Sequence, residues 1–368
     1  MKDERKAIFL HGRVGRGSWQ FAHRLIIFGL FFFLHPSSFI LHPFGILSAN
    51  AQTLDESARA HLSDILNKPL SPRAAALGNA FVAMPDDPNA LFSNPASIST
   101  ITIQDSARMN DLSLSYTHYV LDINEGAVVY EHPVPEGMLF AGNFAAGVQY
   151  FSGGSSTEAN SVGEDLGTFH TGDVALLLAY SSTGTNGLHY GVAAKVVSSS
   201  LVAGSSVQDY SATWMAADLG LFYDWTKENM TFGFSVLNLG TEASTYAGVQ
   251  EPVGPDVQLG ASIKPPHLPL TLSLAFHNLT RDREGRNLFY ALDDFSVGGE
   301  FVMGKVVRLR FGYQNELRHE LSVPTGSGLA GFSGGVGLHI KRYDIDFAID
   351  DEGPDFSSFV RFGLRTAF

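Results

Sequence analysis

The segment Tyr343-Asp344-Ile345-Asp346-Phe347-Ala348-Ile349-Asp350 decides the fold class. Its aromatic and branched aliphatic side chains fall on one face, and the aspartates and Ala348 fall on the other. A period of two is the signature of a β-strand with one apolar face. The stretches around Leu309 and Leu272 repeat the pattern.

Fourteen segments after residue 108 follow this alternation and are separated by turn residues. They lie near 110–120, 124–132, 140–151, 169–181, 188–201, 210–225, 230–238, 255–264, 268–278, 293–302, 305–315, 331–341, 343–350 and 358–368. Bacterial outer-membrane barrels have an even number of strands, and about 9–11 tilted residues cross a bilayer. The sequence therefore predicts an all-β, 14-stranded antiparallel transmembrane barrel over 109–368.

The connections support this prediction, because tight turns near 226–229, 265–267, 303–304 and 342 alternate with long loops. We expect the long loops at 152–168, 239–254, 279–292 and 316–330, with a short exception near 121–123. Membrane barrels have short periplasmic turns and longer outer loops. This pattern predicts that both chain ends face the periplasm.

A soluble sandwich or propeller also alternates, but its strands are usually only about 5–6 residues long. The last predicted strand argues further for a membrane barrel, since it carries Val360, Phe362 and Leu364 on one face and ends at Phe368. A terminal aromatic strand resembles the signal read by the barrel assembly machinery of the outer membrane. We assign that role to Phe362, Leu364 and Phe368.

Composition agrees with a surface that does not face water. Only 17% of the 368 residues are charged, against about 25% in soluble domains, while 38 are glycine and 28 phenylalanine. The chain has no cysteine, which excludes disulfide scaffolds and cysteine-ligated metals. Its net charge of −13 argues against nucleic-acid binding.

The first 51 residues have the parts of a secretory signal peptide. Six basic residues precede the apolar run 25–34, and Ala49-Asn50-Ala51 supplies a small-x-small cleavage site. A membrane anchor needs about 20 apolar residues, and prolines 36 and 43 interrupt this stretch. Removal of 1–51 leaves 18 basic and 35 acidic side chains, a net charge of −17.

Charged residues on the last four strands are expected to form a ladder on the lumenal face. By parity the inward residues are Arg308, Arg310, His339, Lys341, Asp344, Asp346, Arg361 and Arg365. Opposite charges on neighbouring strands contribute about 0.2–1 kcal/mol per pair. We favour a stabilised lumen wall over an ion pathway.

Residues 52–108 do not alternate, and we expect them to form a hatch in or across the lumen. The stretch 54–66 is typical of a short helix, and Asp87-Pro88 and Asn94-Pro95 are typical of capped helical turns. Eight strands already give an interior that side chains can fill, so fourteen leave room for such a segment. The cluster of Asp86, Asp87 and Asn89 suits either capping or a cation, and capping is the preferred interpretation.

The hatch also carries a family resemblance. Arg73-Ala-Ala-Ala-Leu-Gly78-Asn-Ala-Phe-Val-Ala and Asp86-Asp87-Pro-Asn-Ala-Leu-Phe-Ser-Asn94-Pro95-Ala resemble the opening signature of the PorV/PorQ family, which comprises FadL-like barrels of the type IX secretion system. Further motifs at 114–124, 144–150, 165–169, 217–220, 238–240, 328–333 and 339–342 are more similar to its PorQ branch. The C-terminal stretch 365–368 departs from the family by a weaker apolar alternation.

The resemblance implies a non-enzymatic outer-membrane protein without cofactor or metal, which anchors a PorZ-like surface partner through its outer loops. A FadL-like transporter of hydrophobic small molecules is the alternative. A transporter should show a lumenal pocket, whereas an anchor should show a closed lumen. An enzyme is disfavoured because none of the histidines lies in a recognisable catalytic motif.

Overall fold

The computed structural model describes residues 66, 69–101, 110–119, 122–135, 137–138, 140–159, 162–202, 210–245, 254–280, 292–320, 328–351 and 358–368. The expected signal peptide and nearly all of the helix expected at 54–66 lie outside these residues. No helix among the described residues is long and apolar enough to cross a membrane.

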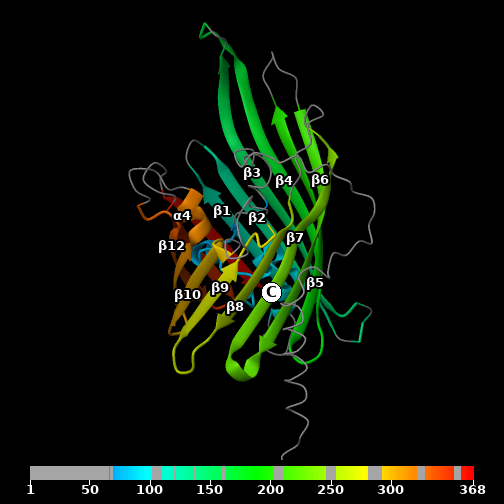
Figure 1. Ribbon diagram of the computed structural model, residues 1–368, viewed down its shortest axis with the longest axis vertical. Helices are drawn as coiled ribbons and strands as arrows, with labels where there is room; N and C mark the ends of the chain where they lie inside the picture. Colours follow the sequence, from blue (N-terminus) through cyan, green and yellow to red (C-terminus); the bar gives the residue numbers. More distant parts are fainter. Residues whose placement is uncertain are drawn as a thin grey trace, which may run out of the picture. The chain divides into compact units, whose positions relative to one another are not determined.

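Fourteen antiparallel strands form one closed barrel, in which β1 pairs with both β2 and β14 (Figure 1). The strands are β1 (Asp111–His118), β2 (Asn124–Val134), β3 (Gly142–Ala159), β4 (Asp165–Thr183), β5 (Leu188–Val202), β6 (Tyr210–Trp225), β7 (Met230–Ser244), β8 (Asp256–Ile263), β9 (Leu270–Phe276), β10 (Phe295–Met303), β11 (Val307–Gln314), β12 (Phe332–Ile340), β13 (Tyr343–Asp350) and β14 (Phe359–Ala367). This confirms the predicted strand number and the predicted barrel.

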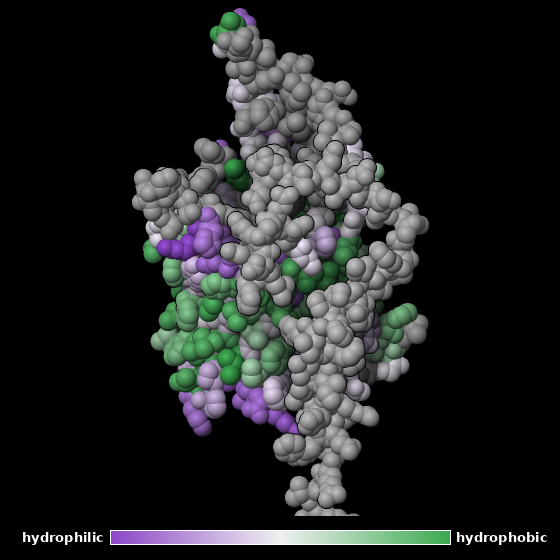
Figure 2. Space-filling model, viewed as in Figure 1, coloured by the Kyte–Doolittle hydropathy of each residue, from purple (hydrophilic) through white to green (hydrophobic). Residues whose placement is uncertain are grey.

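The side chains alternate as the sequence predicts. In β1 the residues from Asp111 to Thr117 are alternately buried and more exposed, and Leu114 and Tyr116 point outward. In β13, Phe347 and Ile349 are exposed while Ala348 and Asp350 are buried. Figure 2 shows the resulting apolar belt over β8–β10, with hydrophilic residues above and below it. Such a belt between two polar rims is the surface that a bilayer requires.

Two of the expected long loops are partly strand. The β3 and β4 strands have 18 and 19 residues, so they extend as a hairpin beyond the neighbouring strands (Figure 1). Gly153-Gly154 resembles a turn in sequence, but Gly154 takes a positive φ of 73° and the register shifts there. A glycine bulge absorbs the irregularity, and pairing resumes at Ser155 and His170. The β7 strand likewise runs to Ser244 rather than ending near 238.

The hatch consists of three short helical turns in its described part: α3 (Pro72–Ala76), η2 (Pro88–Phe92) and η3 (Pro95–Thr100). Each begins with a side chain that accepts a backbone N–H, followed by proline at the first helical position; the caps are Ser71, Asp87 and Asn94. The two caps expected from the sequence are therefore confirmed. The α3 helix contacts β11–β14, and η3 contacts β3–β6, so the hatch reaches across the lumen. Two further helices, η4 (Thr226–Glu228) and α4 (Asn315–Glu320), lie between strands.

Inward-facing glycines let the hatch backbone lie directly against the wall. A Cβ at Gly191 would come within 2.5 Å of the Ala96 nitrogen, and one at Gly298 within 2.7 Å of the Leu77 oxygen. A Cβ at Gly335 would meet the Ala76 Cβ at 2.6 Å. Much of the glycine content therefore serves close packing between hatch and barrel.

The neighbouring glycines of β12 provide a matched test of this packing. Gly335→Ala places a methyl group against Ala76 and the Phe347 carbonyl, so we expect a loss of about 1–3 kcal/mol in unfolding free energy. Gly334→Ala meets only the Arg310 oxygen at 3.8 Å and should change stability by less than about 0.5 kcal/mol. Urea unfolding of the barrel in lipid vesicles measures both. Equal effects would show that the hatch does not press on this wall.

Candidate functional site: the hatch and the lumen wall

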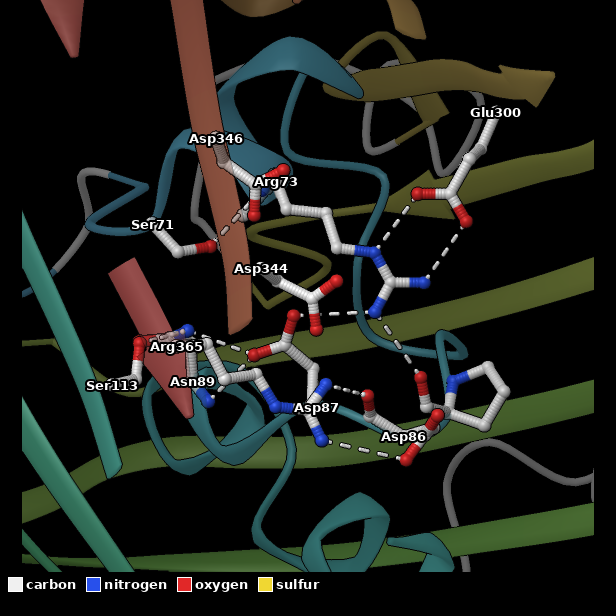
Figure 3. Close-up of polar contacts among 12 residues, drawn as sticks. Ser71, Arg73, Asp86, Asp87, Asn89, Ser113, Glu300, Asp344, Asp346 and Arg365 are labelled. Atoms are coloured by element: carbon white, nitrogen blue, oxygen red, sulfur yellow. Dashed lines mark hydrogen bonds and ion pairs between the residues drawn. The ribbon is translucent and has the colours of Figure 1, made fainter. Parts of the chain in front are cut away.

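Arg73 of α3 is the centre of an ion-pair network between hatch and wall (Figure 3). Its Nε and Nη2 donate to the two carboxylate oxygens of Glu300 on β10, at 3.1 and 3.2 Å. Its Nη1 donates to Asp87 at 3.2 Å and to the Pro85 carbonyl at 3.4 Å. Burial alone would lower the pKa of Arg73, but Glu300 and Asp87 outweigh burial and raise it, so the guanidinium stays charged.

Arg310 extends this network along the wall. Its Nε donates to Glu300 at 2.7 Å, and its Nη1 pairs with Asp346 on β13. The side chains of Arg310 and Glu300 are 1% and 7% exposed, so their charges are stabilised by the ion pair and not by water. Two arginines thus share one carboxylate at the contact between α3 and the barrel.

Arg365 and Arg361 hold the hatch at two other points. Arg365 pairs with Asp111 at 2.6 Å and donates to the Asp86 carbonyl at 2.7 Å. Arg361 pairs with Asp350 at 2.7 Å and donates to the Pro69 carbonyl at 2.9 Å. The β14 strand therefore contacts both the beginning of the described hatch and the segment before η2.

The expected ladder needs one correction. Arg308 donates to Asp344 at 2.7 Å, and His339 lies at the same distance from that carboxylate. Lys341, in contrast, lies in the turn between β12 and β13 and is exposed, with a φ of 59°. The turn interrupts the alternation one residue after Ile340, so strand parity does not apply to Lys341.

The acidic cluster of the hatch acts in capping. Asp87 accepts the Asn89 N–H at 2.9 Å and also pairs with Arg73, and the Asn89 amide donates to Ser113 at 2.9 Å. Asp86 is exposed and has a φ of 60°. Among the described residues no cluster of histidine and carboxylate side chains has the arrangement of a metal site.

The remaining signature residues hold the hatch backbone in place. The Asn94 amide donates to the carbonyls of Val82 and Leu221, at 2.9 and 3.0 Å. Pro95 begins η3 against Gly191. Gly78 has a φ of 61°, and a Cβ there would lie 2.6 Å from the Tyr313 nitrogen.

The residues of the predicted assembly signal lie on the outer face or at the end of β14. Phe362 and Phe368 are exposed, and the Phe362 ring packs on Phe347 with centroids 5.3 Å apart. Leu364 is half-buried.

An apolar cluster lies on the opposite side of the lumen, at β2–β6. Leu91 and Ile98 of the hatch pack against an inner wall of mostly small residues. The wall residues of this cluster are Val129, Ala145, Ala175, Leu177, Ala179, Ala193, Val197, Ala212 and Trp214, on strands β2–β6. The same strands also bury polar residues, among them Glu125, Glu131, Gln149, Asp173 and Lys195. The lumen thus has an arginine-rich side at β10–β14, which binds the hatch by ion pairs, and an apolar cluster at β2–β6.

A cavity beside the hatch lies between these regions. It has a volume of about 30 Å³ and is lined by hatch residues together with Leu237 and Gln258 of the wall. About 10–15 Å³ of such space holds one water molecule, so the cavity is too small for an aromatic hydrocarbon.

Two functional pairs escaped the sequence analysis. Glu300 is the only carboxylate within β10. A single acidic residue on the inward face of an otherwise apolar strand could have predicted an ion pair with a basic residue of the hatch. Lys195 pairs with Asp218 at 2.8 Å and donates to Asn238 at 2.7 Å, with almost no exposure. This second group stabilises the register shift between β6 and β7, which the alternation does not reveal.

No protein-family model and no curated protein matches the chain. Among solved structures it is similar to the toluene transporter TbuX of Ralstonia pickettii, with a TM-score of 0.55 and 14% identity over 83% of this chain and 100% of that chain. The toluene transporter TodX of Pseudomonas putida gives 0.51 and 13%, over 82% and 97%. A Pseudomonas aeruginosa FadL homologue gives 0.47 and 12%, over 81% and 98%.

The chain shares the fold of TbuX and TodX. The closed barrel with its apolar outer face places the protein in the bacterial outer membrane. These comparisons do not support the narrower resemblance to the PorV/PorQ family, which stays a prediction from the sequence motifs.

The ion-pair network predicts how firmly the barrel holds its hatch. Glu300→Ala leaves Arg73 and Arg310 without their shared carboxylate, so we expect a loss of about 3–5 kcal/mol in unfolding free energy. Arg308→Gln breaks a pair whose arginine is 30% exposed and should cost about 1 kcal/mol or less. Urea unfolding in lipid vesicles measures both losses. Planar-bilayer recordings should also show larger ion currents for Glu300→Ala than for the native chain. Unchanged currents would contradict the inference that Glu300 holds the hatch against the wall.

Proposed function

We propose that this barrel carries hydrophobic small molecules across the outer membrane. The observation that carries the proposal is the apolar cluster at β2–β6, where Leu91 and Ile98 of the hatch pack against the wall. The fold shared with the toluene transporters TbuX and TodX supports the same function. Monoaromatic hydrocarbons are the first substrates to test.

The composition of the β2–β6 wall suits an uncharged cargo. Its clustered residues are mainly alanine, valine and leucine, and the buried Lys195 is neutralised by Asp218. The cluster itself offers dispersion contacts, as pockets for apolar ligands do. The charged wall at β10–β14 is a poor path for the same molecule, because desolvating ion pairs is costly.

The hatch is held differently on its two sides. On the charged side Arg73, Arg361 and Arg365 connect it to the wall. On the β3–β6 side the contacts are hydrogen bonds. The Ser99 N–H donates to Ser181 at 3.1 Å, and the Ser181 hydroxyl donates to the Ala96 carbonyl at 3.0 Å. The Ser99 hydroxyl also lies 2.8 Å from His189, and the Asn94 amide donates to the Leu221 carbonyl at 3.0 Å. We therefore infer that η3 moves away from β3–β6 during transport while α3 stays attached.

A disulfide lock tests this movement, because the native chain has no cysteine to interfere. Ser99→Cys combined with Ser181→Cys joins η3 to β4 at the point of their hydrogen bond. We expect the oxidised protein to lose uptake of labelled toluene in cells that lack other such transporters, and a reductant to restore it. Each single variant is the control and should transport as the native chain does. Equal uptake by the locked protein would overturn the proposed movement.

A second candidate is the anchor for a surface protein of a type IX secretion system. The filling of the lumen by the hatch supports it, as does the projecting β3–β4 hairpin with Val162 exposed at its tip. Crosslinking in native membranes separates the two functions. A surface protein recovered with the barrel, together with absent toluene uptake, would support the anchor; toluene uptake without such a partner would support the transporter.

A further inference from the structure

The short-turn end of the barrel carries a row of basic residues that the lumen does not use. The turn after β8 contains Lys264 and His267, the turn after β10 contains Lys305, and the turn after β12 contains Lys341 and Arg342. All five side chains are exposed. We call these residues the basic rim. The mature chain is strongly acidic, so such a concentration of positive charge at one end needs an explanation.

The basic rim is not neutralised by the barrel itself. Its three turns contain no aspartate or glutamate. Asp344, the nearest acid along the chain, is occupied by Arg308 and His339. Within the described part of the chain, no carboxylate lies within ion-pair distance of four basic-rim residues. These are Lys264, Lys305, Lys341 and Arg342. The preceding turn, after β6, differs because Lys227 stands beside Glu228.

Backbone hydrogen bonds hold these turns beside one another. The Lys264 N–H donates to the Asn229 carbonyl at 2.8 Å, and the Val302 N–H donates to the Pro269 carbonyl at 2.7 Å. The His339 N–H donates to the Val306 carbonyl at 2.7 Å. Since strands are about 4.8 Å apart, consecutive turns lie about 10 Å apart along the rim. The positive charges therefore form a fixed row rather than independent tails.

Exposed apolar residues border every turn of the row. Ile263 and Leu268 flank the first turn, Met303 and Val306 the second, and Ile340 and Tyr343 the third; all are exposed. The Arg342 guanidinium lies 5.4 Å from the Tyr343 ring centroid. Basic side chains immediately beyond an apolar belt, with an aromatic residue between them, are typical of the membrane–water interface. Figure 2 shows hydrophilic residues at this lower end, directly below the belt.

We propose that the basic rim binds the anionic phosphate headgroups of bilayer lipids. The apolar belt already requires the lipid acyl chains to reach this height, so the headgroups lie where the lysine and arginine side chains end. The stems of these side chains lie along the lipid tails, while their charges meet the phosphates. An acidic soluble protein would match the charge but would not explain the exposed apolar residues between the turns.

Native mass spectrometry of the full mature chain tests this proposal. The protein is released from vesicles of equal parts phosphatidylglycerol and phosphatidylcholine, and the two retained lipids are compared. We expect the native chain to retain more phosphatidylglycerol, and added salt to reduce the preference. A combined variant, Lys264→Gln, Lys305→Gln, Lys341→Asn and Arg342→Gln, should lose the preference, with about a fivefold decrease for each basic residue removed. Asparagine replaces Lys341 because it tolerates the positive φ there.

The control variant, Lys227→Gln with Arg318→Gln, removes positive charge outside the basic rim and should keep the preference. Migration of the unheated protein on a gel confirms that each variant is folded, and retention of phosphatidylcholine should be the same in all three proteins. The proposal is overturned if the native chain retains both lipids equally, or if the combined variant keeps its preference for phosphatidylglycerol.

Discussion

The pairing of the first strand with the last is the constraint on which the rest of the structure depends. Eight residues of β1, from Asp111 to His118, pair with β14 from Ala367 to Val360. In hydrocarbon an open edge would leave backbone N–H and C=O groups without partners, which costs several kcal/mol for each group. Closure removes both edges at once. It also fixes which side chains face lipid and which face the lumen, because the alternation can no longer slip.

A closed ring of fourteen strands creates an interior too wide for wall side chains to fill, and the hatch supplies the missing volume. The two sides of the lumen meet it with different chemistry. At β10–β14 the arginines form ion pairs whose partners lie on both hatch and wall, whereas at β2–β6 small apolar residues pack on η3. Inward glycines bring the backbones together on both sides. The proposed function rests on this asymmetry, in which ion pairs attach the hatch on one side only.

The sequence was sufficient for most of the barrel, because two-residue alternation reports directly on which side of a strand a residue lies. It also predicted the Asp87 and Asn94 caps, since the capping chemistry is local. It failed where the outcome depends on distant residues. The Gly153-Gly154 bulge is stabilised by pairing with β4, Glu300 takes its role from Arg73 in the hatch, and Lys341 leaves the ladder because the turn begins there. The signal peptide and the secretion-system partner remain predictions.

The contacts of Arg361 and Arg365 carry a consequence for the order of events in folding. Both arginines belong to the last strand, yet they bind the Pro69 and Asp86 carbonyls, 292 and 279 residues away in sequence. These bonds cannot form until β14 has been synthesised, delivered and placed. Contacts at such sequence separation form slowly, because a long loop must close first. The final attachment of the hatch is therefore a late folding step, which follows closure of the barrel. A barrel without β14 lacks these hatch contacts, whereas a completed barrel has them.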